Sequence, residues 1–133
     1  MKLPVDRQHF NKNKLVFLIL LFLWIGLLVY LSGVPHLLAG TQGWLIRKLG
    51  HTAIYGILTF LFWKNISCLT NKFFLRALLC IIAVSILAVY DEVHQMSIPG
   101  RCGNYKGLLF DGLGVVLILG WLHIIHRRLR PNR

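Results

Sequence analysis

Three of the four acidic residues in the sequence surround one short connection between apolar segments. Asp91 and Glu92 close one apolar segment, and Asp111 stands near the start of the next. On a helix, Asp91 shares a face with His94 and Gln95, because residues three and four positions apart are neighbours. Ionisable side chains are costly to place in an apolar chain, so this grouping indicates either a functional site or an ion-pair network.

Acid–base chemistry is the first activity that these residue types allow. His51 and Tyr55 are one helical turn apart in an earlier apolar segment. A carboxylate that acts as a general base, with a histidine as its acid–base partner, is a common catalytic arrangement. The candidate catalytic residues are therefore His51, Asp91, Glu92 and His94.

A structural ion-pair network is the alternative interpretation. Arg101 lies in the same connection, and its guanidinium would neutralise a carboxylate so that the helix ends can pack. This interpretation predicts that Asp91 or Glu92 lies within ion-pair reach of Arg101, with Asp111 facing the same cavity. The sequence lacks the His-x-x-x-His spacing of zinc hydrolases, so no metal site and no cofactor is predicted.

The composition describes the elements that must position these residues. The chain has 133 residues, of which 56% are hydrophobic and 14% are charged, and its mean hydropathy is +0.66. Soluble domains carry about 25% charged residues. The composition therefore excludes a disordered chain, argues against a soluble enzyme and indicates an integral membrane protein. A nucleic-acid binder would also be basic, but it would not be this apolar.

Four apolar segments predict an all-α fold, a four-helix transmembrane bundle with helices at about residues 15–34, 49–63, 73–90 and 108–125. The second segment is the shortest. The first exceeds the length of a signal-peptide core and is expected to remain as an uncleaved helix. Basic tails at residues 1–14 and 127–133 flank the membrane domain at residues 15–126. Gly112, Gly114 and Gly120 are expected to let the last helix approach a neighbour closely.

The distribution of basic residues predicts the orientation. With four spans, the two tails and the second connection share one side, which carries eleven Lys and Arg residues against four on the other side. The positive-inside rule then places both termini in the cytoplasm and the acidic connection outside. The net charge of +11 is explained by this topology and by contact with anionic lipid, so no nucleic-acid partner is predicted.

Two runs of residues resemble, in order, the motifs of the VanZ-like family of small bacterial membrane proteins, which is named for a glycopeptide (teicoplanin) resistance factor. The first run is Arg47-Lys48-Leu49-Gly50-His51, with Tyr55 four residues later. The second is Asp91-Glu92-x-His94-Gln95 with Pro99-Gly100-Arg101, and Asp111 with Gly114 continues it. The resemblance covers about residues 47–120.

The resemblance implies a multi-pass protein of the bacterial cell membrane. Two positions depart from the family pattern. Many members have Glu where this chain has Ile54, and they usually have Asp where it has Gly107. These departures remove two carboxylates that a metal site or an acid–base site would use.

The leading functional hypothesis is an envelope factor that binds a membrane lipid at the outer leaflet and affects teicoplanin susceptibility. The ligand would be an anionic lipid or a lipid-linked cell-wall precursor, held by the candidate ligand-binding residues Arg47, Lys48, His51, Tyr55, Glu92, Gln95, Arg101 and Asp111. One alternative is a small membrane hydrolase or transferase that uses Asp91 or Glu92 with His51 or His94. Another is an oligomer or a structural subunit of a larger membrane complex, because four short helices bury little surface.

Overall fold

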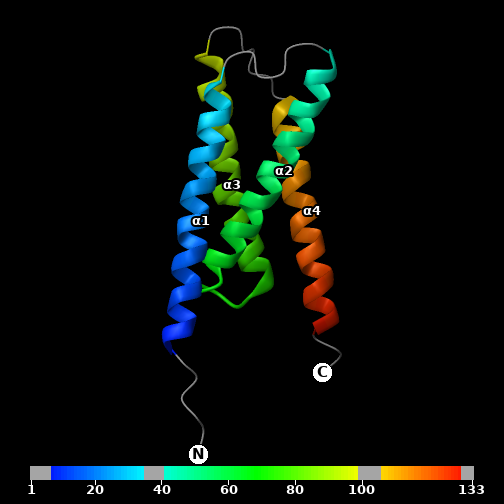
Figure 1. Cartoon of the computed structure of the whole chain (residues 1–133). Helices are drawn as coiled ribbons and strands as arrows, with labels where there is room; N and C mark the ends of the chain where they lie inside the picture. Colours follow the sequence, from blue (N-terminus) through cyan, green and yellow to red (C-terminus); the bar gives the residue numbers. More distant parts are fainter. Residues whose placement is uncertain (1–6, 35–40, 99–105, 130–133) are drawn as a thin grey trace, which may run out of the picture.

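The structure is a computed structural model of the 133-residue chain, and it describes residues 7–34, 41–98 and 106–129. Four helices form nearly all of this part: α1 (Arg7–Gly33), α2 (Thr41–Ile66), α3 (Phe73–Met96) and α4 (Lys106–Leu129). The helices alternate in direction, so the start of α1 and the end of α4 lie at the same end of the bundle (Figure 1). The described residues contain no strand, and the predicted all-α four-helix fold is confirmed.

Three of the helices are long and apolar enough to cross a membrane: residues Lys12–Gly33 of α1, all of α3, and residues Gly107–Leu129 of α4. Among the described helices, α2 does not meet this criterion, and it is also the one with the shortest apolar segment in the sequence. Its 26 residues nevertheless span about 39 Å at the rise of an α-helix, and it runs the length of the bundle (Figure 1). Polar residues in its first half lower its hydropathy.

All four helices extend beyond the apolar segments that predicted them. For example, α2 begins at Thr41 instead of near residue 49, and α3 continues to Met96 instead of ending near residue 90. An apolar run marks the part of a helix that matches the hydrocarbon, whereas the hydrogen-bonded helix continues into the polar interface. As a result, Asp91 and Glu92 lie inside the last turns of α3 and have fixed directions on its surface.

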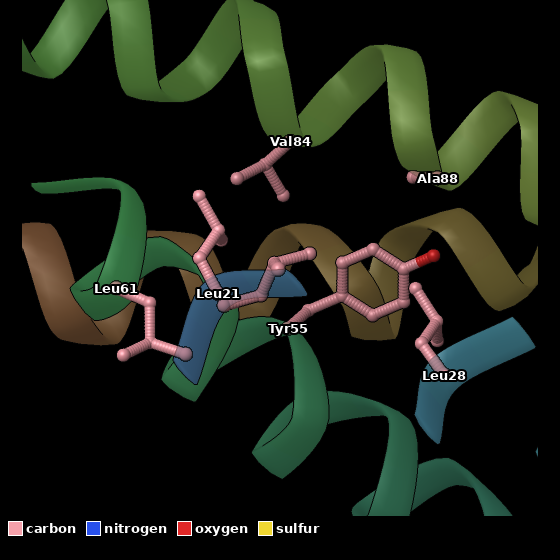
Figure 2. Packing of buried hydrophobic residues seen from close by; sticks show 7 residues of the cluster. Leu21, Leu28, Tyr55, Leu61, Val84 and Ala88 are labelled. Atoms are coloured by element: carbon pink, nitrogen blue, oxygen red, sulfur yellow. The ribbon is translucent and has the colours of Figure 1, made fainter. Parts of the chain in front are cut away.

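The core lies where α1, α2 and α3 meet. Figure 2 shows the Tyr55 ring among aliphatic side chains from α1 and α3, and the buried cluster comprises Leu21, Leu28, Tyr55, Leu58, Leu61, Val84 and Ala88. Large apolar side chains such as Phe22 and Val116 are two-thirds exposed on the outside of the bundle. A soluble protein would bury these side chains, and a membrane protein presents them to lipid.

A close contact between α2 and α4 fixes the rotation of both helices. A Cβ atom added to Gly114 would overlap the Thr52 carbonyl oxygen and lie 2.9 Å from the Gly56 backbone nitrogen. The prediction of close approach is therefore confirmed for Gly114. It is wrong for Gly112 and Gly120, where an added Cβ would meet nothing within 4 Å, because these two residues point away from α2.

Candidate functional site

Three helices bring ionisable side chains to the end of the bundle that lies opposite the start of α1 (Figure 1). We call this region the carboxylate end and define it by Lys48, His51 and Tyr55 of α2, Asp91, Glu92 and Gln95 of α3, and Asp111 of α4. The close contact at Gly114 lies one turn below it on α4. The packing of small residues therefore sets the distance between the polar side chains of α2 and α4.

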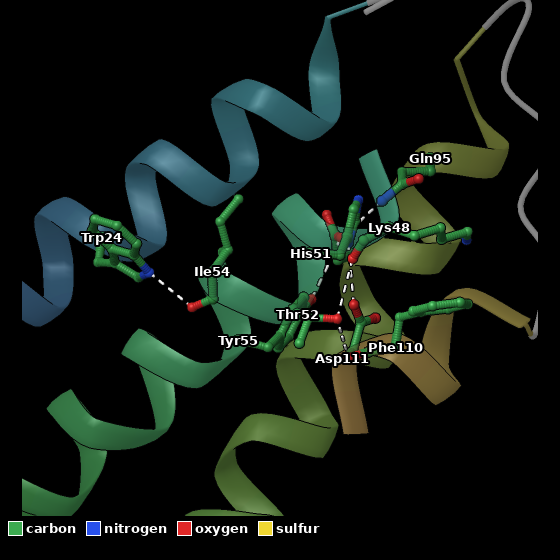
Figure 3. A network of polar contacts seen from close by, with 10 residues as sticks. Trp24, Lys48, His51, Thr52, Ile54, Tyr55, Gln95, Phe110 and Asp111 are labelled. Carbon is green, nitrogen blue, oxygen red and sulfur yellow. Dashed lines mark hydrogen bonds and ion pairs between the residues drawn. The ribbon is translucent and has the colours of Figure 1, made fainter. Parts of the chain in front are cut away.

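A histidine–carboxylate pair joins α2 to α4. His51 Nδ1 lies 3.1 Å from Asp111 Oδ1, and Asp111 is buried (Figure 3). Thr52 strengthens the same junction, since its hydroxyl oxygen lies 3.0 Å from the Phe110 carbonyl oxygen and 3.2 Å from that of Lys48. If His51 donates its Nδ1 proton to Asp111, its Nε2 atom is an acceptor, and the pair can take up a proton from a ligand.

A second carboxylate is held between α2 and α3. Asp91 is 3% exposed, and its Oδ2 atom accepts hydrogen bonds from Gln95 Nε2 at 2.8 Å and from the Tyr55 hydroxyl at 3.4 Å. The Tyr55 ring stacks on the His51 ring, with centroids 6.3 Å apart, and so connects the two carboxylates. Asp91 Oδ1 is buried and has no hydrogen-bond partner among the described residues.

A third carboxylate, that of Glu92, lies against the first turn of α4. A Cβ atom added to Gly107 would be 3.2 Å from Glu92 Oε2 and 3.5 Å from Lys48 Nζ. Because Gly107 has no side chain, the Glu92 carboxylate from α3 and the Lys48 ammonium from α2 can both reach the N-terminal end of α4, where the helix dipole is positive. The other oxygen, Glu92 Oε1, is buried, and none of the described residues provides it with a partner.

The remaining predicted site residues are placed differently. His94 faces α1 and does not face His51. Its Nε2 atom would be 3.9 Å from a Cβ added to Gly33 of α1, and its ring stacks on that of Tyr90, with centroids 6.3 Å apart. Arg47 precedes Lys48 on α2. Arg101 lies outside the described residues, so its ion pair with Asp91 or Glu92 remains a prediction.

Two polar contacts at or near the site involve residues that the sequence analysis did not single out. The Thr52 hydroxyl reaches α4, and the Trp24 indole nitrogen donates to the Ile54 carbonyl oxygen at 3.0 Å (Figure 3). Both had a signal in the sequence. A hydroxyl within an apolar helix needs a carbonyl acceptor, and a buried indole N–H needs one as well.

The described residues hold no group of three or more His, Cys, Asp or Glu side chains that could bind a metal ion. Within these residues, the arrangement offers two chemistries. The His51–Asp111 pair can exchange a proton, and the partnerless oxygens of Asp91 and Glu92 can accept hydrogen bonds from a ligand.

Comparison with known families finds one model, described as VanZ/LLP1, which matches residues 4–126 and so covers nearly the whole chain. Comparisons with curated proteins and with solved structures find no match.

Proposed function

The chain belongs to the VanZ/LLP1 family. From this membership and from the chemistry of the carboxylate end, we propose that it binds a phosphate-bearing lipid headgroup at the outer leaflet of the bacterial cell membrane. The ligand class is a phosphate-bearing lipid, such as an anionic lipid or a lipid-linked cell-wall precursor, and occupancy of the carboxylate end changes susceptibility to teicoplanin. The link to the antibiotic derives from the resemblance to the VanZ-like family, and the lipid derives from the chemistry of the site.

The observation that carries the proposal is a pair of buried acceptors, on consecutive residues of α3, that the described protein leaves unused. Asp91 Oδ1 and Glu92 Oε1 are both buried and lack donors within the described chain. An unpartnered buried acceptor costs about 1–3 kcal/mol, so helix packing alone does not account for two of them side by side in the sequence. Such atoms are expected where a ligand supplies the donors, and in a headgroup these donors are the hydroxyl or ammonium groups beside the phosphate.

The position of the site fits a headgroup. The carboxylate end lies where α2 begins and α3 ends, and the count of basic residues assigns this end to the outer face of the membrane. Lys48 Nζ, beside the first turn of α4, supplies a positive charge for a phosphate. Lipid headgroups occupy this depth.

The His51–Asp111 pair supports a second candidate function, a membrane hydrolase or transferase acting on the same class of headgroup. In that case His51 would be the general base for an attacking water or hydroxyl. The two candidates share a binding step and differ in turnover.

Binding is tested with purified protein in detergent, titrated with phosphatidylglycerol and with an isoprenyl pyrophosphate and followed by native mass spectrometry. We expect saturable binding that weakens about tenfold in Lys48→Gln, because one charge-assisted contact is lost. Lys64→Gln is the matched control. Lys64 is also on α2 and also lies over a phenylalanine ring, at 5.3 Å from the Phe60 centroid against 5.6 Å for Lys48 over Phe110.

The same samples discriminate the two candidate functions. Phosphate release that disappears in His51→Gln would establish the enzyme, whereas binding without release supports the headgroup-binding function. Teicoplanin susceptibility of a host that expresses each variant should follow the binding data. Non-saturable association, or an equal effect of Lys48→Gln and Lys64→Gln, would contradict the proposal.

A further inference from the structure

The two partnerless oxygens of the carboxylate end specify the chemistry of the ligand more narrowly than a phosphate does. Asp91 and Glu92 are consecutive residues of α3. Asp91 Oδ2 accepts two hydrogen bonds and Glu92 Oε2 lies beside Gly107, whereas the other oxygen of each carboxylate is buried without a partner in the described chain. Both oxygens are acceptors, and both groups carry negative charge when ionised. A ligand that complements them must donate hydrogen bonds and carry positive charge.

The protein donors nearby do not contact these two atoms within the described residues. Gln95 Nε2 and the Tyr55 hydroxyl both contact Asp91 Oδ2, and His51 Nδ1 contacts Asp111. Lys48 Nζ lies at Gly107, on the side of Glu92 Oε2. These donors therefore do not serve Asp91 Oδ1 and Glu92 Oε1.

We propose that the headgroup bound at the carboxylate end carries a primary ammonium next to its phosphate, with Asp91 and Glu92 receiving the ammonium and Lys48 the phosphate. This inference rests on the proposed function. A primary ammonium has three N–H donors and a compact charge, so it can contact two separate carboxylates. A guanidinium favours both oxygens of one carboxylate, but Asp91 Oδ2 is already occupied.

A headgroup without a positively charged group fits less well. The hydroxyls of a glycerol headgroup donate hydrogen bonds, but they do not compensate the buried negative charge. A metal ion would need further oxygen or nitrogen ligands, and the described residues offer no group of three that could hold one. Lys48 and Glu92 both lie beside Gly107, and their opposite charges match a headgroup that carries both signs.

The test is a lipid series that varies only the headgroup nitrogen. Wild-type protein in detergent is titrated with phosphatidylethanolamine, its N,N-dimethyl derivative, phosphatidylcholine and phosphatidylglycerol of equal acyl composition. We expect phosphatidylethanolamine to bind at least tenfold more tightly than phosphatidylcholine, with the dimethyl lipid between them. Phosphatidylcholine keeps the positive charge and the phosphate but has no N–H donor.

Protein variants then locate the preference. Asp91→Asn and Glu92→Gln should reduce the ratio of phosphatidylethanolamine to phosphatidylcholine affinity to less than about threefold, and Lys64→Gln should keep it at the wild-type value. Soluble phosphoethanolamine is the second arm. Competition by it shows that the headgroup suffices, whereas binding of the lipid alone shows that the acyl chains contribute.

The outcomes separate the two proposals. Equal binding of all four lipids overturns the ammonium site and leaves headgroup binding intact. An absence of saturable binding by any of them and by the isoprenyl pyrophosphate overturns both. If Glu92→Gln fails to fold, the lipid series with the wild-type protein still decides the matter, because it needs no variant.

Discussion

The end of the bundle opposite the carboxylate end is also polar, but it is built from aromatic rings and cations. We call it the aromatic end and define it by Trp63, Phe73, Phe74, His123 and His126. The Phe73 ring centroid lies 4.9 Å from that of Trp63 and 5.0 Å from those of His123 and His126. This packing joins α2, α3 and α4, as the carboxylates do at the other end.

The two ends differ in how their polar side chains are satisfied. At the aromatic end, Asn65 donates to the carbonyl oxygens of Phe17 and Leu61 at 3.0 and 2.8 Å. Arg76 donates to the Thr70 carbonyl oxygen, and its guanidinium lies 4.7 Å from the Trp63 ring centroid. The same helices can therefore pack polar groups with their partners supplied from within. Among the described residues, the carboxylate oxygens without partners are a specific property of the other end.

The largest expected effect concerns the side of the membrane that each end faces. A membrane-impermeant thiol reagent should label Cys102 in intact cells and Cys68 only after permeabilisation. Cys68 is exposed at the aromatic end, and buried Cys80 should stay unlabelled in the folded protein. Labelling of Cys68 in intact cells would show that the aromatic end faces outward and that the carboxylate end faces the cytoplasm.

Gly114→Ala should abolish the geometry of the carboxylate end while sparing the aromatic end. The new methyl group would overlap the backbone of α2, which cannot yield as a flexible side chain can, so we expect a loss of about 3 kcal/mol. Unfolding in detergent can be followed by reaction of buried Cys80 with a thiol dye in a Cys68→Ser, Cys102→Ser background.

Gly120→Ala is the matched control for this glycine. It lies on the same helix in open surroundings and should be neutral or slightly stabilising, because alanine favours a helix by roughly 0.5–1 kcal/mol over glycine. Equal stability of the two variants would show that α2 and α4 are not in tight contact.

Arg101→Ala tests whether the carboxylate end depends on a cation from the neighbouring connection. We expect a loss of about 2 kcal/mol, smaller than for a deeply buried pair, and a lower membrane abundance by immunoblot. Adding Glu92→Gln should restore abundance without restoring the teicoplanin phenotype, because the groups that contact the ligand are still missing. Full rescue of the phenotype by the double variant would show that the network is structural.

The smallest expected effect is a change in unfolding free energy when one polar residue from each end is replaced. Asn65→Ala should cost about 1 kcal/mol, since it removes contacts that the protein uses for packing. Asp91→Asn should change the unfolding free energy by less than that, because neutralising a buried carboxylate with a partnerless oxygen removes an unfavourable charge. If Asp91→Asn lowers the unfolding free energy more than Asn65→Ala does, the ionised Asp91 stabilises the packing of the helices.

The number of helices and the gathering of the acids at one end of the bundle could be predicted from the sequence, because length, hydropathy and connection order determine both. The rotation of each helix could not. The apolar segments are hydrophobic on every face, so their pattern does not say that His94 faces α1 or that Asp111 meets His51. Close backbone contact at Gly114 fixes that rotation, whereas the sequence predicted close packing equally for Gly112, Gly114 and Gly120.

The dependence of α2 on α4 also constrains how the chain enters the membrane during synthesis. α2 is not apolar enough to count among the candidate spans, and its His51, Thr52 and Gly56 meet their partners on a helix that is made last. Until α4 leaves the ribosome, His51 lacks the Asp111 carboxylate and Thr52 has only the Lys48 carbonyl oxygen of its own helix, and holding these polar groups in hydrocarbon is unfavourable. Stable insertion of α2 must therefore follow translation of α4.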